Sequence, residues 1–389
     1  MRRPAGQPAD LRNTPTPLKW NAAIEADLKV RLDEMGADGN PRRGGASGPP
    51  SELRVYTRRV KTFVILISVF FGSGCALSRA ISLQPGGAAR VSEESVRAHM
   101  EFLAGDALNG RGSGTRDEWI AVTYAAAQMR RLGLEPLGDA GGYVQSIATQ
   151  GEGNRTWNAV GRLSGRDAAR RSEVILLSAH IDHLGNRAGQ ANAAADTIYN
   201  GADDDASGTI AVLELMEALA RGPKPQRTVI FALFGSEERG GAGSRYFADR
   251  PPVPLTQIVA NLQFEMIGRP DGTVPARTLW LTGYERSNLG PALAGRGARL
   301  VQDPHPEMSF FTRSDNIQFA RRGVVAHTVA SYGLHKEYHT PADEIGRIDF
   351  THMTDAIASL VEPIRWLANS TFRPTWNPGG QPPPAKGSP

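Results

Sequence analysis

Three short apolar runs constrain the fold of this chain more than any other feature. They cover residues 174–179, 228–234 and 258–264, and each is hydrophobic over nearly its whole length rather than at alternate positions. Such runs are typical of strands that are buried on both faces, as in parallel sheets. A helical pattern at residues 209–220 separates the first run from the second. This alternation predicts an α/β fold with a mostly parallel, mixed central sheet flanked by helices on both faces.

Weaker patterns extend this body in both directions. Ser92 can cap a helix that runs through Leu103, and further helices are expected over residues 117–132 and 350–367. Early strands are expected around Val144 and over residues 157–163, and later ones over residues 278–281 and 324–329. The Pro- and Gly-rich tail at residues 374–389 is expected to be disordered.

The composition is that of an ordinary globular chain. Of its 389 residues, 40% are hydrophobic and 22% are charged. The formal net charge of +4 arises in the first 75 residues, so the remainder is near neutral and no nucleic-acid partner is expected. Cys75 is the only cysteine, which excludes an intramolecular disulfide and a thiolate-rich zinc site.

The N-terminal part of the chain predicts export. Residues 1–52 are expected to be disordered, or to reflect a start codon placed too far upstream. Residues 53–75 resemble a signal peptide, with a basic segment, an apolar run at 62–71 and small residues that end at Cys75. That run is shorter than the roughly 20 residues of a spanning helix.

Three forms of this signal are considered. The favoured one is a lipoprotein signal with an acyl anchor on Cys75, although Gly72 departs from the aliphatic residue usual three places before a lipidated cysteine. The alternatives are a plain secretory signal and an uncleaved anchor. The protein is accordingly expected in the periplasm or on a membrane, and otherwise secreted.

Polar side chains gather where the predicted strands end, which is where open α/β sheets place their sites. Neighbouring carboxylates repel one another unless a cation lies between them. Imidazoles and carboxylates together suit zinc or a similar divalent metal. The donors that follow successive strands are His180, Asp182, Asp204, Glu237, Glu238, Glu265 and His339.

Each segment taken singly has a simpler explanation. The His-x-Asp pair would suit a surface turn, the acidic stretch a solvated loop, and Glu237-Glu238 an exposed turn. Glu265 could form an internal ion pair with Arg269. The metal hypothesis is favoured because all of these segments fall at strand ends.

The segments together resemble one family. The order Ala-His-x-Asp, Gly-Ala-Asp-Asp-Asp-Ala-Ser-Gly, Phe-Gly-Ser-Glu-Glu, Phe-Glu-Met-Ile-Gly-Arg and Tyr-His-Thr-Pro-Ala-Asp is similar to that of the co-catalytic zinc aminopeptidases. Relatives in that family include glutamate carboxypeptidase II and the transferrin receptor ectodomain. The resemblance runs from about residue 91 to residue 367 and implies a zinc peptidase catalytic domain over residues 91–368. The short 143–172 connection leaves no room for the protease-associated domain of longer members.

The resemblance implies two Zn²⁺ ions and a role for each donor. His180 and Glu265 would hold one zinc, Glu238 and His339 the other, and Asp204 would bridge them. Asp182 would orient His180, Glu237 would be the general base toward a hydroxide shared by the metals, and Tyr338 would hydrogen-bond the developing oxyanion. Many members have Asp at the position of Glu265. The resemblance also implies a cis Asp204–Asp205 peptide and a place near the substrate pocket for residues 309–315.

The implied function is that of a zinc-dependent exopeptidase, an aminopeptidase that removes N-terminal residues from peptides. A family carboxypeptidase would instead need an arginine for the C-terminal carboxylate, and Arg286, Arg313, Arg321 and Arg322 are available. A glutaminyl cyclase-like enzyme would use a single zinc, and a non-catalytic binding protein on the same fold would be expected to have lost ligands. The sequence has no Gly-x-Ser-x-Gly nucleophile elbow, which argues against a serine hydrolase.

Overall fold

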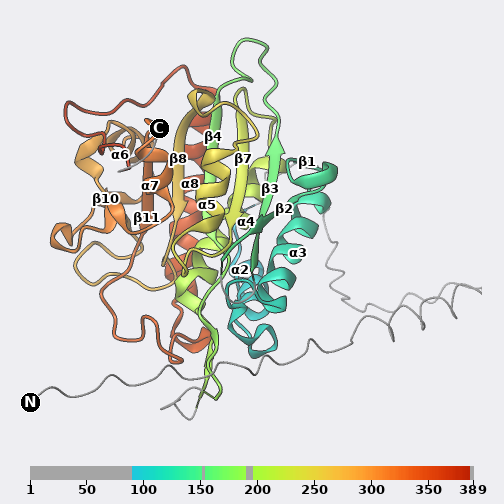
Figure 1. Ribbon diagram of the computed structural model, residues 1–389. Coiled ribbons are helices and arrows are strands. Elements are labelled where there is room, and N and C mark those ends of the chain that lie inside the picture. The colour runs from blue at the N-terminus through green and yellow to red at the C-terminus, as the bar shows by residue number, and fades with distance from the viewer. Residues whose placement is uncertain (1–89, 151–153, 190–195, 386–389) are drawn as a thin grey trace, which may run out of the picture. The chain divides into compact units, whose positions relative to one another are not determined.

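A nine-stranded mixed sheet organises the part of the chain that the structure describes (Figure 1). The structure is a computed structural model and describes residues 90–150, 154–189 and 196–385. The strand order is β1-β3-β7-β4-β8-β11-β9-β10, and β2 pairs with β3. The expected N-terminal extension, signal segment and Cys75 lie outside the described residues. None of the described helices is long and apolar enough to cross a bilayer.

The centre of the sheet is parallel, as the sequence predicts. Strand β4 (Val174–His180) lies between β7 (Thr228–Phe234) and β8 (Ile258–Phe264) and is parallel to both. Strand β11 (Ala326–Ala330) continues the parallel set beyond β8. All the residues of these four strands are buried, which explains why their sequences do not alternate between apolar and polar.

Antiparallel strands complete both sides of the sheet. On one side, β3 (Arg155–Leu163) runs antiparallel to β7 and pairs with β2 (Val144–Ala148) and β1 (Glu135–Pro136). On the other side, β9 (Leu279–Leu281) is antiparallel to β11 and parallel to β10 (Leu300–Gln302). A separate two-stranded sheet joins β5 (Gly185–Asn186) to β6 (Ile198–Tyr199).

Helices cover both faces of the central sheet (Figure 1). The larger core includes residues from α2 (Glu93–Leu103), α3 (Arg116–Arg131), α4 (Gly208–Ala220), α6 (Leu289–Ala294) and α8 (Phe350–Asn369). The smaller core includes residues from α5 (Ala242–Asp249) and α7 (Asn316–Ala320). In β4, Ile175 and Leu177 belong to the larger core and Leu176 to the smaller one, because successive strand residues face opposite sides.

Side-chain caps fix where several of these helices begin. Ser92 accepts a hydrogen bond from the Ser95 amide at the start of α2, as the sequence predicts. Thr115 and Asp349 cap α3 and α8 in the same way. Helix α4 has no such cap and instead follows directly on the irregular turn Ala202–Ser207, which carries the three consecutive aspartates.

The C-terminal segment differs from the expectation. Residues 374–385, within the tail expected to be disordered, are anchored on the body of the protein. Trp376 forms a β-bridge with Ser287, and its ring centroid lies 5.3 Å from that of His327. Asn377 donates a hydrogen bond to the carbonyl oxygen of Glu285. These contacts are made with distant residues, so the high Pro and Gly content of the segment does not reveal them.

Candidate metal centre

The structure brings all five sequence-predicted metal ligands to the carboxyl end of the parallel strands. His180 is the last residue of β4, Glu238 follows β7, and Glu265 comes directly after β8. Asp204 lies in the turn before α4, and His339 lies in the loop between β11 and α8. Parallel strands end at the same edge of a sheet, so residues far apart in the sequence meet there.

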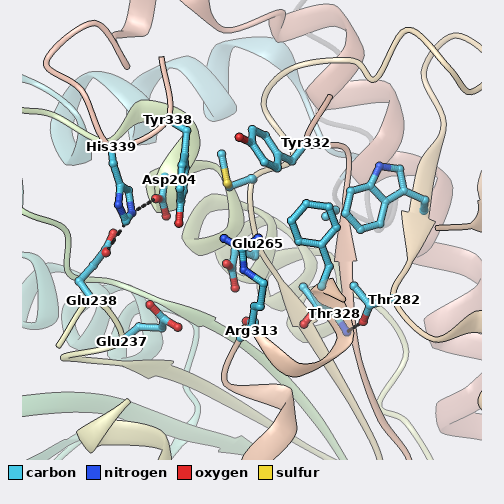
Figure 2. A pocket seen from close by; sticks show the side chains of 15 residues that line it. Asp204, Glu237, Glu238, Glu265, Thr282, Arg313, Thr328, Tyr332, Tyr338 and His339 are labelled. Carbon is cyan, nitrogen blue, oxygen red and sulfur yellow. Dashed lines mark hydrogen bonds and ion pairs between the residues drawn. The ribbon is translucent and has the colours of Figure 1, made fainter. Parts of the chain in front are cut away.

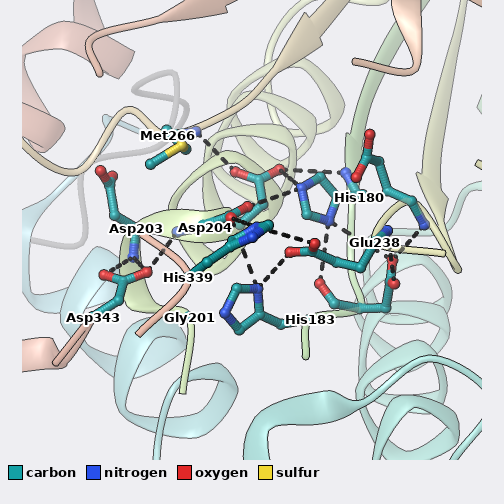
Figure 3. Close-up of polar contacts among 12 residues, drawn as sticks. His180, His183, Gly201, Asp203, Asp204, Glu238, Met266, His339 and Asp343 are labelled. Carbon is teal, nitrogen blue, oxygen red and sulfur yellow. Dashed lines mark hydrogen bonds and ion pairs between the residues drawn. The ribbon is translucent and has the colours of Figure 1, made fainter. Parts of the chain in front are cut away.

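Asp204 lies at the centre of the group (Figure 3). Its Oδ1 atom is 3.2 Å from Nε2 of His180, and its Oδ2 atom is 3.1 Å from Nε2 of His339. The same His339 nitrogen is 3.1 Å from Oε2 of Glu238. Donor atoms of His180, Asp204 and Glu238 all lie within 4.8 Å of one another, close enough to share metal ions. Asp204 therefore faces one histidine with each carboxylate oxygen, which is the arrangement a bridging ligand requires.

Two buried donor atoms of the centre form no hydrogen bond with the described residues. Nε2 of His180 lies 3.2 Å from Oδ1 of Asp204 without forming a hydrogen bond to it, and Oε2 of Glu265 has no partner. Leaving such atoms unsatisfied in the interior is costly, whereas a metal ion would use both. Glu265 forms no ion pair with Arg269, which instead binds Glu337 at 3.1 Å. The residues present therefore fit a divalent metal.

Several buried carboxylates lie close together in the centre and shift the pKa values of its residues. Desolvation by burial raises the pKa of Glu265 to about 7 and outweighs the opposing charge of His180, and the negative charge of Asp204 adds a smaller increase. Burial also raises the pKa of Glu237, helped by the charges of Glu265 and Asp315. A bound cation would reverse this repulsion and favour the ionised forms.

His339 shows the opposite balance. Burial acts to lower the pKa of its imidazole, but the contacts with Asp204 and Glu238 outweigh burial and raise the pKa to about 9. In the protein without metal, the imidazole thus acts as the counter-charge of these two carboxylates. A metal ion would replace the proton, because a ligating imidazole must be neutral.

Asp182 contacts both His180 and the turn that carries Glu237 and Glu238. Nδ1 of His180 lies 3.2 Å from the Asp182 carbonyl oxygen and 3.7 Å from its carboxylate. The same carboxylate accepts hydrogen bonds from the amides of Glu237 and Glu238, at 3.0 and 3.4 Å, and from the Ser113 hydroxyl. Asp182 therefore positions the glutamates as well as His180, a wider contribution than the resemblance implies.

The backbone is unusual beside three of the predicted residues. Ser236, Met266 and His339 have φ angles of 57°, 52° and 56°, in the left-handed region that side chains other than glycine rarely adopt. Such conformations cost of the order of 1–3 kcal/mol each and cluster at functional sites. The Asp204–Asp205 peptide is cis, which confirms the expectation.

The metal centre opens into a pocket of about 530 Å³, a volume that includes space open to solvent (Figure 2). Glu237 and Tyr338 line it together with four of the five predicted ligands, His180 being the exception. Phe310, Arg313 and Ser314, from the 309–315 segment expected near the substrate pocket, line it as well. A substrate in this pocket would contact the predicted general base and the predicted oxyanion donor at once.

Sequence reasoning missed three supporting residues. His183 donates a hydrogen bond from Nδ1 to Oε1 of Glu238, 2.7 Å away. Asp205 accepts hydrogen bonds from the amides of His180, Gly208 and Met266, and so joins three elements. Asp343 accepts from the amides of Asp203 and Asp204 and fixes the acidic turn. Asp205 and Asp343 lie within the motifs quoted above and His183 directly follows one, but only the fold shows their partners.

The fold and this set of donors define an α/β protein with a candidate metal centre at the carboxyl end of a mostly parallel sheet. A family model described as Peptidase family M28 matches residues 158–362, which is more than half of the chain. The chain belongs to Peptidase family M28. This agrees with the resemblance seen in the sequence.

Several curated relatives share part of the sequence. Leupeptin-inactivating enzyme 1 of Streptomyces exfoliatus is 27% identical over 183 residues, which cover 46% of this chain and 36% of the relative. A probable zinc metalloprotease of Pyrenophora teres f. teres is 29% identical over 191 residues, covering 47% and 38%. Leucine aminopeptidase 1 of Uncinocarpus reesii is 28% identical over 167 residues, covering 39% and 42%. The chain thus spans less than half the length of these relatives.

Solved structures share the fold. The aminopeptidase from Aneurinibacillus sp. strain AM-1 superposes with a TM-score of 0.54 at 15% identity, covering 72% of this chain and 95% of that one. LapB from Legionella pneumophila gives a TM-score of 0.55 at 19% identity, covering 72% and 73%. Likeness at this level of identity establishes the architecture.

Proposed function

We propose that this protein is a zinc-dependent exopeptidase that removes N-terminal residues from peptides. One observation carries the proposal. Side chains from five separate segments meet at the carboxyl end of the sheet, where Asp204 lies beside both His180 and His339, and the buried Nε2 of His180 and Oε2 of Glu265 form no hydrogen bond with the described residues. Family membership and the names of the zinc metalloprotease and aminopeptidase relatives support the same reading.

Two zinc ions would fit the donors. His180 and Glu265 would hold one ion, Glu238 and His339 the other, and Asp204 would contribute one oxygen to each. When bound, zinc would polarise the scissile carbonyl and make water a better nucleophile near neutral pH. The carboxylate oxygens and imidazole nitrogens present are ligands that zinc accepts.

Glu237 is the proposed general base. Glu237 lies in the turn after β7 and immediately precedes the proposed ligand Glu238, and its side chain lines the pocket. Its raised pKa suits a group that takes a proton from the attacking water and then gives it to the leaving amine. The hydrogen bond from its amide to Asp182 holds the turn that presents it.

Tyr338 is the proposed donor to the developing oxyanion. Its ring stacks on His339 with centroids 3.8 Å apart, so the ligand loop carries both residues into the pocket. Burial, together with the charges of Asp204 and Glu238, raises the pKa of its hydroxyl. The hydroxyl therefore keeps its proton at neutral pH and can donate it in a hydrogen bond.

The alternative functions have less support. A single-zinc enzyme would leave part of this donor set without a role, and a non-catalytic protein would not need Glu237 in the pocket. Of the four arginines considered for a carboxypeptidase, only Arg313 lines the pocket, so the substrate panel below tests that alternative. The aminopeptidase names among the relatives lead us to favour an aminopeptidase.

The deciding experiment joins metal analysis to a substrate panel. Peptides with free N-termini are compared with the same peptides carrying an acetyl block, and with peptides whose C-termini are amidated. We expect two zinc ions per chain and cleavage only where the amino end is free. Cleavage that requires a free C-terminus and tolerates the acetyl block would refute the aminopeptidase assignment.

We further propose that the protein is exported and carries a lipid on Cys75. The signal-like sequence of residues 53–75 supports this proposal. Membrane fractionation and mass spectrometry of the mature N-terminus test it. An acylated Cys75 at the mature N-terminus is expected, and a mature chain starting elsewhere without lipid would refute it.

A further inference from the structure

The pocket has two chemically different ends. Carboxylates of the metal centre, such as Glu237 and Glu265, form one end (Figure 2). Trp280, Phe310 and Tyr332 line the pocket as well and form an aromatic wall, in which Trp280 stacks on Phe310 with centroids 5.5 Å apart. A substrate residue that enters the pocket would therefore contact aromatic side chains and the polar side chains that lie among them.

Arg313 is the positively charged side chain that lines the pocket beside these aromatic residues. It is the only Lys or Arg among the described residues that line the pocket, and its guanidinium lies 5.1 Å from the Phe310 ring centroid. Figure 2 shows its side chain directed into the pocket, with Glu265 and Thr328 on either side of it in that view. Stacking on an aromatic ring restricts a guanidinium while leaving its N–H groups available.

Arg313 forms no ion pair with a carboxylate in the part of the chain that the structure describes. Other arginines of this region are engaged, since Arg269 binds Glu337 and Arg322 binds Asp249. The guanidinium of Arg313 is therefore a charged hydrogen-bond donor in the pocket that has no carboxylate partner among the described residues.

A guanidinium in this position matches a carboxylate. A guanidinium can bind both carboxylate oxygens at once, and this charge-assisted pairing is stronger than a neutral hydrogen bond. Arg313 is the only Lys or Arg among the described residues that line the pocket, so an anionic substrate group in the pocket would be attracted to its guanidinium.

We propose that Arg313 binds a carboxylate of the substrate, so that the enzyme prefers peptides that place a negative charge in this pocket. The proposal rests on the aminopeptidase function and names its substrate class. The carboxylate can come from the side chain of an N-terminal Glu or Asp, or from the free C-terminus of a dipeptide. Arg313 would thus determine specificity, and Glu237 would keep its separate role in the chemistry.

The first experiment compares glutamyl, glutaminyl and leucyl p-nitroanilides, which separate charge from size. We expect kcat/KM for the glutamyl substrate to exceed that for the glutaminyl one by about tenfold or more. Arg313→Gln should remove this preference by lowering the glutamyl value alone, and Arg313→Lys should restore part of it. Arg250→Gln is the matched control, because Arg250 is also exposed and lies 5.1 Å from an aromatic centroid, that of Tyr246, outside the pocket.

A second arm identifies the source of the carboxylate. Leucyl dipeptides with free and amidated C-termini are compared in the wild type and in Arg313→Gln. A loss confined to the free acids assigns Arg313 to the C-terminal carboxylate, whereas a loss confined to glutamyl substrates assigns it to the side chain. Equal rates on charged and neutral substrates in both arms, unchanged by Arg313→Gln, would overturn the proposal while leaving the aminopeptidase function intact.

Binding separates this proposal from the proposed function. The zinc-loaded protein is titrated with L-glutamate and with L-glutamine in a calorimeter. If glutamate binds more tightly than glutamine and Arg313→Gln abolishes the difference, the role of Arg313 is supported even when no peptide is cleaved. The absence of peptide cleavage would refute only the aminopeptidase function. Equal binding of the two amino acids by the wild type, joined to equal dipeptide rates, would overturn the role of Arg313.

Discussion

Asp204 shows how much one side chain of this protein depends on its neighbours. Its carboxylate faces His180 on one side and His339 on the other, and its amide donates to Asp343. Asp182 and Asp205 fix the backbone around it through amide hydrogen bonds. Hydrogen bonds thus position His180, Asp204 and Glu238, and such support favours a metal site of defined geometry.

Glu237→Gln tests the general base. Glutamine keeps the size of the side chain but cannot take a proton, so we expect kcat to fall by roughly 10²–10⁴-fold. Zinc content should be unchanged, because Glu237 is not among the ligands. Activity assays and metal analysis on the same preparation measure both quantities. A fully active variant would remove Glu237 from this role.

His183→Ala tests a residue that sequence reasoning missed. Its Nδ1 lies 2.7 Å from Oε1 of Glu238, so its loss should free that ligand and weaken metal binding by about 10–100-fold. Competition with a chromogenic chelator measures the affinity. His99→Ala, which removes another buried, hydrogen-bonded histidine far from the centre in sequence, is the control. Affinities that match in the wild type and both variants would contradict the role of His183.

At the scale of elements, strand ends and helix starts together build the site. Strands β4, β7 and β8 each deliver a donor at or just after their last residue. Helix α4 then fixes the acidic turn, because it packs in the larger core against the sheet and α8. An error in strand register would move the donors by whole residues, so the buried apolar faces that set the register also set the site.

The contact between α2 and α4 predicts a dependence of stability on pH. Burial raises the pKa of Glu214 to about 7, although the Ser95 hydroxyl donates to it. The unfolded chain binds fewer protons than the folded one between pH 4.5 and 7, so this group favours folding at low pH and its contribution is lost as the pH rises through 7. Burial lowers the pKa of nearby His99 to about 4, which keeps that imidazole neutral over this range.

Glu214→Gln should therefore flatten the stability profile. Between pH 5 and 8 we expect the wild type to lose about 3 kcal/mol more than the variant. Urea unfolding at a series of pH values measures this difference. Glu94→Gln, at an exposed position of α2, should leave the profile as it is in the wild type. Parallel profiles for the wild type and Glu214→Gln would contradict the assigned pKa.

At the scale of the whole molecule, the metal centre joins segments that lie far apart in the sequence. His180 and His339 lie far apart in the sequence, yet both contact the carboxylate of Asp204. Without metal, the centre gathers buried carboxylates that repel one another, which opposes the packing of the core around it. Metal binding should therefore stabilise the fold as a whole.

Metal removal should lower Tm. A ligand at a thousandfold excess over its Kd stabilises the folded state by about 4 kcal/mol, and we expect a loss of this order after chelation. Calorimetry with and without a chelator, followed by zinc addition, measures the effect and its reversal. The variant His339→Ala should show a smaller difference between the two forms. A Tm that does not respond to chelation in the wild type would argue against this linkage.

Much of this protein could be predicted from its sequence. The expected bounds of β7 and β8 agree with the structure, since uniformly apolar runs flanked by polar residues leave little choice of boundary. Strand β11 begins two residues later than expected, because Val324 and Val325 are buried without belonging to the strand. The donors of the centre could be predicted because each stands in a motif at a strand end.

The sequence by itself determined the local patterns, that is, which runs become strands, which residues cap helices and which side chains can bind metal. Only the tertiary structure decided the order of the strands, the antiparallel sides of the sheet, the anchoring of residues 374–385, and the pairing of His183 with Glu238. It also placed Arg313 in the pocket and left the other three candidate arginines outside. The physical reason is that periodicity and side-chain chemistry are local properties, whereas these contacts join residues that only the packing of the core brings together.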